Sequence, residues 1–551
     1  MTVDTQTVGT YLLDTLYDEG VRHIFGIPGD YVIRFNKQIE SHPIQFINTT
    51  RENTAGYIAD AYARIAGLGV ACITYGVGIN IVNSLAQAYV EGSPVVVISG
   101  AAGQGESGQQ GVLHHLIHQP ADGLDRTQLE IFKQVTVAQA VLDDSVEAPQ
   151  KIQEILRICK DTNQPVYIEL PRDQVEAPLQ EVNLPHAQDL KSDPKALQQA
   201  LDETLQLLQQ SKRPLIWAGH EVRSYGLQKS LLQFAENNQI PIVSTLLGKT
   251  VMDEHHPLFV GVYQGDMSEK SIAQFAHQAD ACLAIGALLT DVDTGMFTAK
   301  LYEEKRIKAD KKGIRIGHDD YPNVRFVDFV EGLVNVRRDP VYQYSIPSRS
   351  ASIDTTFVAQ ADTKITSARL FDCLQSYISS DQYIVTDIGD CLFGATDLVL
   401  RQNSFQACAY FATLGFCVPG AVGAAVALPD RRVIGLVGDG AFQMTAAELS
   451  TAARYGLDPV IILLNNHGYG TERPLLEGEF NDIQNWQYSQ LAEVLGGNGY
   501  GIRVTTEEEF DTALATALAE RGRYVIIEVD LEKLDFSPAM ERFCALVKSR
   551  I

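Results

Sequence analysis

The stretch from Arg432 to His467 constrains the fold of this chain more than any other segment. It reads RVIGLVGDGAFQMTAAELSTAARYGLDPVIILLNNH, and an apolar run from Val433 to Val437 leads directly into Gly438-Asp439-Gly440. A second apolar run, Val460 to Leu464, ends at Asn465-Asn466. Two buried strands joined by one helix form a right-handed parallel crossover unit. Asp439 and Asn466 are therefore predicted to be neighbours at the carboxyl edge of a sheet, where open α/β sheets bind ligands.

The segment between the two apolar runs is predicted to be a helix. Thr445 and Glu448 stand at the spacing of a capping box, and Gly456 provides a C-terminal stop. A carboxylate, a side-chain amide oxygen and a loop carbonyl are ligands that Mg2+ or Ca2+ accepts, and a helix N-terminus beside them suits phosphate. Either half of the pattern alone is more often an ordinary turn or loop. Their spacing, with a strand before each, favours a metal-bridged diphosphate.

This segment resembles the diphosphate-binding signature of enzymes that depend on thiamine diphosphate, and VGDGAFQMTAAEL is similar to their 2-keto acid decarboxylase branch. The resemblance implies that Asp439, Asn466 and the backbone carbonyl of Gly468 hold Mg2+. It also implies that Leu414 holds the two cofactor rings in a bent shape, while the Ala412 carbonyl accepts a hydrogen bond from the cofactor amino group. The implied cofactor-binding positions of this domain are Asp390, Ala412, Leu414, Gly438, Asp439, Gly440, Ala441, Asn466, Gly468 and Tyr469.

Composition and charge indicate a large protein of several domains. The 551 residues are 45% hydrophobic, which suffices for more than one core. Asp and Glu number 69 against 44 Lys and Arg, so the formal charge of −25 argues against nucleic-acid and anionic-membrane partners. The eight cysteines form no CxxC pair, the N-terminus has no basic leader, and no apolar run approaches the ~20 residues of a membrane span. A soluble cytoplasmic protein is expected.

Repeated strand, turn and helix units predict an α/β fold with three doubly wound parallel-sheet domains. The expected domains are 1–180, which the resemblance identifies as pyrimidine-binding, 197–337 in the middle, and 364–551, which it identifies as diphosphate- and Mg2+-binding. The first and third are expected to share one architecture and to grip opposite ends of a cofactor. The middle domain has no GxGxxG, so it is interpreted as structural, with regulation or another ligand as the less favoured role.

Two acidic residues of the first domain are candidate catalytic groups. Asp30 ends the string GIPGD, and Glu52 stands near the start of RENTAGYIADAYARIAG. On general grounds the first is a solvated turn residue and the second an acid favoured in a first helical turn. Both strings resemble segments of thiamine-diphosphate enzymes. That resemblance implies that Asp30 faces the reacting carbons and that Glu52 hydrogen-bonds and activates the aminopyrimidine ring of the cofactor.

His114 and His115 are adjacent in the loop-like segment AAGQGESGQQGVLHHLIHQ. Such a pair is more often exposed or structural than catalytic. Metal binding is disfavoured, because the two side chains are expected to point in different directions and no Cys or carboxylate stands at ligand spacing. The pair resembles the catalytic His-His motif of 2-keto acid decarboxylases. It departs from that motif in being followed by Leu116, which leaves His118 as an alternative.

The same resemblance implies a further catalytic residue and a substrate pocket. Glu472, in HGYGTERPLL, stands where the decarboxylases carry a glutamate, and the alternative is an acid at the start of a surface helix. TDIGDCLFGATDL and EFNDIQNW look closest to indolepyruvate and phenylpyruvate decarboxylases, which favours a bulky, aromatic substrate. The alternative is that the pocket positions are packing residues. The expected pocket residues are Cys391, Leu392, Phe393, Leu475, Leu476 and, on a C-terminal helix that could cover the site, Met540.

These features predict the non-oxidative decarboxylation of a 2-keto acid to an aldehyde and CO2, with thiamine diphosphate and Mg2+. Loss of CO2 leaves a carbanion that requires an electron-sink cofactor. Pyruvate or a branched-chain 2-keto acid is the alternative substrate. A carboligase, which the His pair and Glu472 argue against, is an alternative reaction, and a non-catalytic cofactor-binding sensor or assembly subunit, which Glu52 argues against, is an alternative of another class. In the family that the chain resembles, two subunits build each site, so at least a homodimer is predicted, with a homotetramer as the expected assembly.

Overall fold

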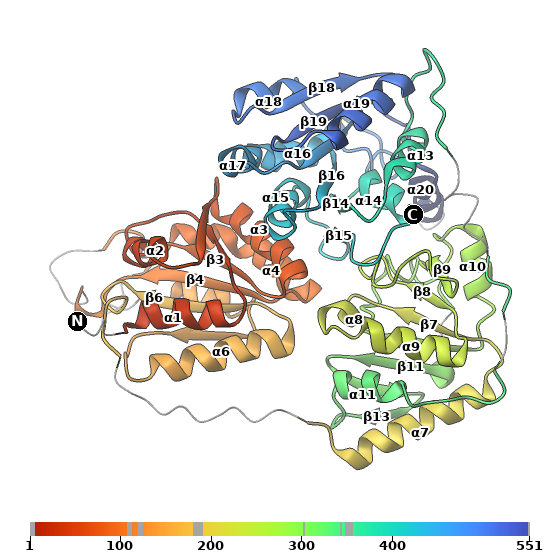
Figure 1. Ribbon diagram of the computed structural model, residues 1–551, viewed down its shortest axis with the longest axis horizontal. Coiled ribbons are helices and arrows are strands. Elements are labelled where there is room, and N and C mark those ends of the chain that lie inside the picture. The colour runs from red at the N-terminus through yellow and green to blue at the C-terminus, as the bar shows by residue number, and fades with distance from the viewer. Residues whose placement is uncertain are drawn as a thin grey trace.

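The computed structural model describes residues 6–106, 113–118, 125–179, 191–300, 303–341, 344–347 and 356–548. It contains three α/β units, each built around one sheet (Figure 1). The N-terminal unit lies on the left of Figure 1, the middle unit at lower right and the C-terminal unit at the top. The predicted fold class of three doubly wound, mainly parallel sheets is confirmed. No helix in the described part of the chain is long and apolar enough to cross a membrane.

The N-terminal sheet consists of six parallel strands. Its strand order is β2 (Gln45–Asn48), β1 (His23–Gly26), β3 (Gly69–Ile73), β4 (Val95–Ala101), β6 (Val166–Pro171) and β5 (Ala138–Val141). Its helices are α1 (Val8–Asp18), α2 (Ile33–Glu40), α3 (Glu52–Ala66), α4 (Val82–Glu91), α5 (Thr127–Phe132) and α6 (Ala148–Thr162). β3, β4 and β6 are buried along their whole length, as is typical of parallel strands covered on both faces.

The middle sheet has seven strands, and its edge pair is antiparallel. Its order is β13 (Asp319–Tyr321), β12 (Gly313–Ile316), β11 (Arg306–Asp310), β10 (Ala281–Ile285), β7 (Pro214–Ala218), β8 (Ile242–Ser244) and β9 (Phe259–Val262). The helices are α7 (Pro194–Gln210), α8 (Glu221–Ser224), α9 (Gln228–Asn238), α10 (Lys270–Ala276) and α11 (Phe326–Leu333). β12 pairs antiparallel with both of its neighbours, whereas the other strands pair parallel.

The C-terminal sheet again has six parallel strands. Its order is β15 (Phe405–Ala407), β14 (Gln382–Thr386), β16 (Arg432–Gly438), β17 (Val460–Asn465), β19 (Val525–Asp530) and β18 (Tyr500–Val504). The helices are α13 (Ser367–Tyr377), α14 (Asp390–Thr396), α15 (Cys417–Ala427), α16 (Asp439–Thr445), α17 (Leu449–Tyr455), α18 (Leu491–Val494), α19 (Glu507–Ala519) and α20 (Pro538–Lys548). When the six strands of each unit are numbered along the chain, both sheets have the order 2-1-3-4-6-5. The predicted likeness of the first and third domains is therefore confirmed.

Helices α3 and α15 join the N-terminal and C-terminal units, and they lie next to each other in Figure 1. Both are rich in alanine and glycine, which lets their backbones approach closely. A Cβ atom placed on Gly423 would lie 2.5 Å from the carbonyl oxygen of Ile58. The glycine is therefore required by the distance between the two helices rather than by helix propensity, which it lowers.

A buried ionic network crosses the same junction. Arg64, on α3, pairs with Asp60 at 2.8 Å and with Glu91 at 2.7 Å, and its guanidinium also donates to the carbonyl of Ala407. The other oxygen of Glu91 accepts from the backbone N–H of Tyr410 at 2.8 Å. Each charge is both paired and hydrogen-bonded, which is what the burial of charged groups requires. The network attaches the loop after β15 to the N-terminal unit.

We predict that Gly423→Ala destabilises the protein by about 1–3 kcal/mol, the usual cost of overpacking a tightly packed contact. The added methyl group would collide with the backbone of α3, which can move away only if the two helices separate. Thermal unfolding measures the change. Gly420→Ala, in the same helix, is the matched control, because its Cβ would meet only side-chain atoms at 3.2 Å. Equal melting temperatures for the two variants would contradict the close-packing argument.

Candidate active site

Strands β16 and β17 bring Asp439 and Asn466 to one edge of the C-terminal sheet. Gly438, the last residue of β16, pairs with Leu464 of β17, so the two candidate residues follow directly after neighbouring strand ends. Asp439 is the first residue of α16. The side-by-side placement expected from the parallel crossover is therefore observed.

The predicted start of the helix after β16 was wrong. α16 begins at Asp439, seven residues earlier than a capping box at Thr445 would place it, and the Thr445 side chain caps no helix. Thr445 donates instead to the carbonyl of Gly415 at 2.9 Å, and Glu448 accepts from the backbone N–H of Thr50 at 3.4 Å. Both residues serve tertiary contacts that sequence spacing alone does not reveal.

The carboxylate of Asp439 is buried and has only backbone donors as hydrogen-bond partners among the described residues. Its side chain accepts from the N–H of Gly440 at 2.8 Å and from the N–H of Gly468 at 2.9 Å, and the residue is 1% exposed. Burial raises the pKa of this carboxyl group to about 6. A nearby cation would offset the cost of keeping the buried group ionised.

The loop after β17 is shaped to approach Asp439 closely. Gly468 has φ +141°, and any Cβ at this position would overlap with the carbonyl oxygen of Asn481. His467, with φ +62°, is also in the left-handed region, which costs a non-glycine residue about 1–3 kcal/mol. The side chain of Asn466 lies against Gly470, where a side chain would collide with it. Backbone conformation therefore determines where the amide oxygen and the carbonyl can point.

A cavity of about 200 Å³ opens in front of these loops. It brings together all ten cofactor-binding positions predicted in this domain, and Glu472 joins them. The remaining lining residues were not predicted to bind the cofactor, although most of them flank predicted ones in the sequence. These additional residues are Ile388, Gly389, Cys391, Leu464, Gly470, Thr471, Leu531, Asp535 and Phe536, of which Cys391 was expected in the substrate pocket.

A buried carboxylate, that of Asp387, accepts hydrogen bonds from the end of the loop that carries Ala412 and Leu414. Asp387 accepts from the backbone N–H of Gly415 at 3.1 Å and from that of Cys417 at 2.9 Å. Burial raises the pKa of Asp387 to about 7. Ala412 has φ +58°, a strained conformation that the surrounding contacts must enforce. Leu414 lines the cavity and is 37% exposed, although it is a large apolar residue.

Asp390 connects the cavity wall to the C-terminal helix. Its carboxylate accepts from the hydroxyl groups of Ser367 and Ser537, and from the backbone N–H of Ser537 at 3.0 Å. Burial raises its pKa. Asp535, two residues before Ser537, lines the cavity and accepts from the N–H of Ser367 at 2.7 Å. Only Met540 was predicted as a site residue in this C-terminal segment, so the contribution of Asp535 to the wall was missed.

The predicted substrate-pocket residues fall into different environments. Cys391 lines the cavity, whereas Leu392 is 1% exposed within the core of the C-terminal unit. Phe393 stacks on Phe543 of α20 with ring centroids 4.5 Å apart, and Met540 belongs to the same apolar cluster. Leu475 is half-buried and Leu476 is exposed, and neither lines the cavity of the single chain. Glu472 itself lies in a turn rather than at a helix start.

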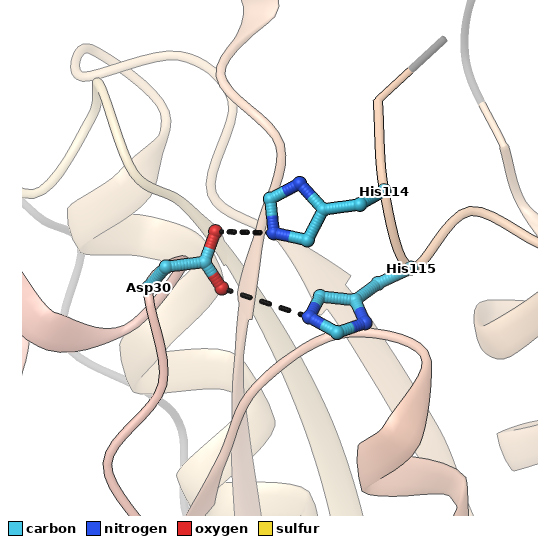
Figure 2. A group of neighbouring side chains, drawn as sticks. All are labelled: Asp30, His114 and His115. Atoms are coloured by element: carbon cyan, nitrogen blue, oxygen red, sulfur yellow. Dashed lines mark ion pairs between the residues drawn. The ribbon is translucent and has the colours of Figure 1, made fainter.

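Three of the four predicted catalytic residues of the N-terminal unit, Asp30, His114 and His115, form a second cluster, which Figure 2 shows. The Nε2 atom of His114 lies 2.9 Å from Asp30 Oδ2, and that of His115 lies 3.9 Å from Asp30 Oδ1. The expectation that the two histidines point in different directions was wrong. His115 has φ +68°, and this left-handed conformation turns both rings to the same side. His118 does not belong to this group of metal-ligating side chains.

Glu52 is the first residue of α3, as expected for an acid in a first helical turn. Its carboxylate accepts from Asn80 at 3.1 Å. Neither Glu52 nor the Asp30, His114 and His115 group is part of the cavity wall around Asp439, which consists of residues 388–536 only. One chain therefore presents the two halves of the candidate site on different surfaces.

The residues around Asp439 fit a hard divalent cation and a diphosphate. The carboxylate of Asp439, the Asn466 amide and the Gly468 carbonyl supply oxygen ligands, which Mg2+ prefers. No ion pair within 4.0 Å involves the buried carboxylate among the described residues, and the N-terminus of α16 offers backbone N–H groups beside it. The fold and the site thus define an α/β enzyme that holds a diphosphate-bearing cofactor through a metal ion.

Comparison with known proteins identifies the family. Residues 6–125 match the thiamine pyrophosphate enzyme N-terminal TPP binding domain, residues 201–335 the central domain, and residues 387–529 the C-terminal TPP binding domain. The chain belongs to the thiamine pyrophosphate enzyme family. Its cofactor is therefore thiamine diphosphate, which is another name for thiamine pyrophosphate.

Relatives match along almost the whole chain. An indole-3-pyruvate decarboxylase of Azospirillum brasilense is 34% identical over 539 residues, which cover 97% of this chain and 96% of the relative. An alpha-keto-acid decarboxylase of Mycobacterium tuberculosis is 31% identical over 541 residues, covering 96% and 95%. A protein of the same description from Mycolicibacterium paratuberculosis is 31% identical over 539 residues, covering 96% and 94%.

We predict that Asp439→Asn abolishes the stabilisation that thiamine diphosphate and Mg2+ give to the protein. At a ligand concentration about 100 times the Kd, wild-type protein should gain about 2.7 kcal/mol, and the variant close to none. Without cofactor the variant should be at least as stable as the wild type, since a buried carboxylate has been removed. Melting temperatures with and without both ligands measure this. Asp381→Asn, which alters an exposed carboxylate at the opposite end of the sheet, should respond like the wild type.

Proposed function

We propose that this enzyme catalyses the non-oxidative decarboxylation of a bulky, preferably aromatic, 2-keto acid to the corresponding aldehyde and CO2. The observation that carries the proposal is the cavity in which every cofactor-binding position predicted for the C-terminal domain meets Glu472. The names of the relatives support the reaction, because one is an indole-3-pyruvate decarboxylase and others are alpha-keto-acid decarboxylases. Each matches over nearly its full length.

Each group at the cavity has a role in holding the cofactor. Asp439, Asn466 and the carbonyl of Gly468 would bind Mg2+, while backbone N–H groups at the start of α16 would face the diphosphate. Leu414 would support the rings, and the Ala412 carbonyl would accept a hydrogen bond. When bound, thiamine diphosphate supplies the electron sink that decarboxylation requires. Glu52 would hydrogen-bond the aminopyrimidine ring of a cofactor held by a second chain.

Proton transfer is assigned to groups from both units. Asp30 and His114 already share a 2.9 Å contact, so a proton can pass between the carboxylate and the imidazole Nε2. His115 stands beside them, and its ring centroid is 4.4 Å from that of His114. Glu472 reaches the site from the loop after β17. With Glu472 on one side and the Asp30, His114 and His115 relay on the other, the carbon that has lost CO2 can gain a proton, and the aldehyde can then leave.

The preference for a bulky substrate is supported by the apolar surroundings of α20. Phe536 lines the cavity and also packs against an apolar cluster that borders it. The buried members of this cluster are Met267, Phe393, Ala539, Met540 and Cys544. An aromatic side chain is stabilised more than a methyl group by such a wall, since the favourable free energy grows with the apolar area buried.

We predict that the purified protein with Mg2+ and thiamine diphosphate converts phenylpyruvate or indolepyruvate at a kcat/KM at least about tenfold above that for pyruvate, because each extra apolar group in a pocket contributes roughly 10–200-fold. Release of aldehyde and CO2 measures turnover, and branched-chain 2-keto acids complete the panel. Faster turnover of pyruvate would contradict the substrate assignment. No product from any of these acids would favour a non-catalytic, cofactor-binding role.

The division of the site between two surfaces supports an assembly of at least two chains. The cavity around Asp439 lacks Glu52, and large apolar side chains stand exposed in the loops of the C-terminal unit. Among these are Met444, Phe480 and Trp486, which are 43%, 64% and 40% exposed. We therefore propose a homodimer in which each chain supplies Glu52 to the cavity of the other, and two such dimers forming a homotetramer. A cytoplasmic location is also proposed, because all eight cysteines are free thiols.

We predict that Glu52→Gln and Asp439→Asn complement each other. Glu52→Gln alone should bind cofactor but lose about 100-fold or more in kcat, the usual contribution of a positioned acid–base group. In a mixed dimer one of the two sites has neither substitution. Since about half of randomly paired dimers are mixed, co-produced chains should regain up to about a quarter of wild-type activity. Differently tagged chains allow the mixed species to be isolated and assayed.

Chains that both carry Glu52→Gln serve as the control and should regain nothing. A verified mixed dimer without activity would show that the site lies within one chain. Full activity in a monodisperse monomer, measured by light scattering, would contradict the shared site in a second way.

A further inference from the structure

We propose that Asp30, His114 and His115 form a binding site for a borderline divalent metal ion, Zn2+ in particular, and that an ion bound there inhibits the enzyme. The three side chains offer two imidazole nitrogens and a carboxylate oxygen, all within 4.8 Å of one another. They make up the one group of this kind among the described residues. The sequence argued against metal binding because no carboxylate stands near the His pair, and the fold supplies one from 84 positions earlier in the chain, at Asp30.

The geometry is close to that of a metal site before any ion is bound. Zinc–nitrogen and zinc–oxygen bonds of about 2.0–2.2 Å place neighbouring ligand atoms roughly 3.0–3.5 Å apart. His114 Nε2 and Asp30 Oδ2 are 2.9 Å apart, so a small separation of this pair suffices. His115 Nε2 lies 3.9 Å from Asp30 Oδ1, and the three ligand atoms all lie within 4.8 Å of one another, so movements of about 1 Å bring them to bonding separations. Figure 2 shows both rings with Nε2 directed at the same carboxylate.

The two histidines are held in this arrangement by the fold. The His114 ring stacks on the buried Tyr31, with centroids 5.4 Å apart and an interplanar angle of 18°. The Tyr31 hydroxyl donates to the backbone carbonyl of His114 at 2.8 Å. Because His115 is in the left-handed region, its ring shares the same side as that of His114. Preorganised ligands lose little conformational entropy when an ion binds, which raises affinity.

The charges around the group favour a cation. Arg172 lies 3.6 Å from Asp30 Oδ2, which alone would oppose a second positive charge. Its guanidinium is already paired with Glu106, which accepts from Nε at 2.8 Å and 3.0 Å. With neutral imidazoles, Asp30, Glu106 and Arg172 together carry one net negative charge. The side chains of His114, His115 and Asp30 are 61%, 31% and 40% exposed, so an ion can enter from solvent and keep water ligands.

The chemistry separates this site from the magnesium site around Asp439. Imidazole nitrogen suits Zn2+ and its neighbours in the transition series, whereas Mg2+ prefers oxygen ligands in octahedral geometry. An ion at Asp30, His114 and His115 occupies the lone pairs that would otherwise carry the relayed proton. Inhibition therefore follows if these residues are the relay, and this second part of the proposal rests on the proposed function.

Metal binding is tested on the holoenzyme with saturating Mg2+ and thiamine diphosphate. Titration with Co2+, followed by its visible absorption bands, and with Zn2+ by calorimetry should show one high-affinity equivalent per chain. His114→Gln and His115→Gln should each weaken this binding by at least about tenfold, because one of three protein ligands is lost. His118→Gln is the matched control from the same segment and should bind like the wild type.

Undiminished binding in both variants, with far-ultraviolet circular dichroism showing native folding, would overturn the site. It would mean that the ion binds elsewhere, for example in place of Mg2+. This experiment needs no turnover, so its outcome is independent of whether the protein is a decarboxylase.

Inhibition is tested by adding Zn2+ during turnover of phenylpyruvate with Mg2+ in excess. Activity should fall in proportion to occupancy of the site and return fully when a zinc-selective chelator is added. Full activity in enzyme whose site is occupied by Zn2+ would overturn the inhibitory role. A protein without decarboxylase activity that still binds the ion through His114 and His115 would contradict the proposed function and leave the metal site standing.

Discussion

The parallel pairing of β16 and β17 is the constraint on which the candidate site depends. It places Asp439 and Asn466 at adjacent strand ends, and α16 starts at the aspartate itself, so its first N–H groups lie beside the carboxylate. The carboxylate is buried with backbone donors alone among the described residues, and burial raises its pKa to about 6. A buried acid in this state is stabilised by a cation, and a cation at a helix N-terminus is stabilised by phosphate. Fold, metal and cofactor are thus linked by one electrostatic requirement.

The chain uses one architecture twice and gives its strand ends different chemistry. In the C-terminal unit the carboxyl edge of the sheet carries Asp439 and Asn466, whereas in the N-terminal unit the carboxyl edge carries Asp30 and Glu52 after different strands. The contact between α3 and α15 fixes how these two units meet within a chain. Because Glu52 lies outside the cavity around Asp439 in a single chain, the proposed dimer brings in the N-terminal unit of another chain to complete the site. In that proposal, assembly and activity depend on the same geometry.

The sequence predicted the fold and the side-by-side placement of Asp439 and Asn466, since continuous apolar runs and glycine-rich strand ends are local signals. It could not predict features that depend on rotation about single bonds or on distant segments. The left-handed conformation of His115 reverses the expected direction of one ring, and no spacing rule reports it. α14 begins at Asp390, so Cys391 lines the cavity while Leu392 lies in the core. The sequence pattern does not determine which side of this helix each residue occupies. Asp535 reaches the wall from a segment about 150 residues from Asp390 along the chain.

The site around Asp439 and the Asp30, His114 and His115 group prefer different cations, because different parts of the fold supply their ligand atoms. Strand ends and tight glycine turns expose carboxylate, amide and carbonyl oxygens, which form a hard site around Asp439. The chain after β4 instead contributes two imidazoles, and Asp30 adds a carboxylate to them. The resulting group offers two nitrogen ligands and one oxygen ligand. Mg2+ binds the second type poorly and Zn2+ binds it well, so one protein can require one ion and be inhibited by the other. In the proposed function the proton relay uses the same nitrogen atoms that a borderline ion such as Zn2+ prefers, so a bound ion and a relayed proton compete for His114 and His115.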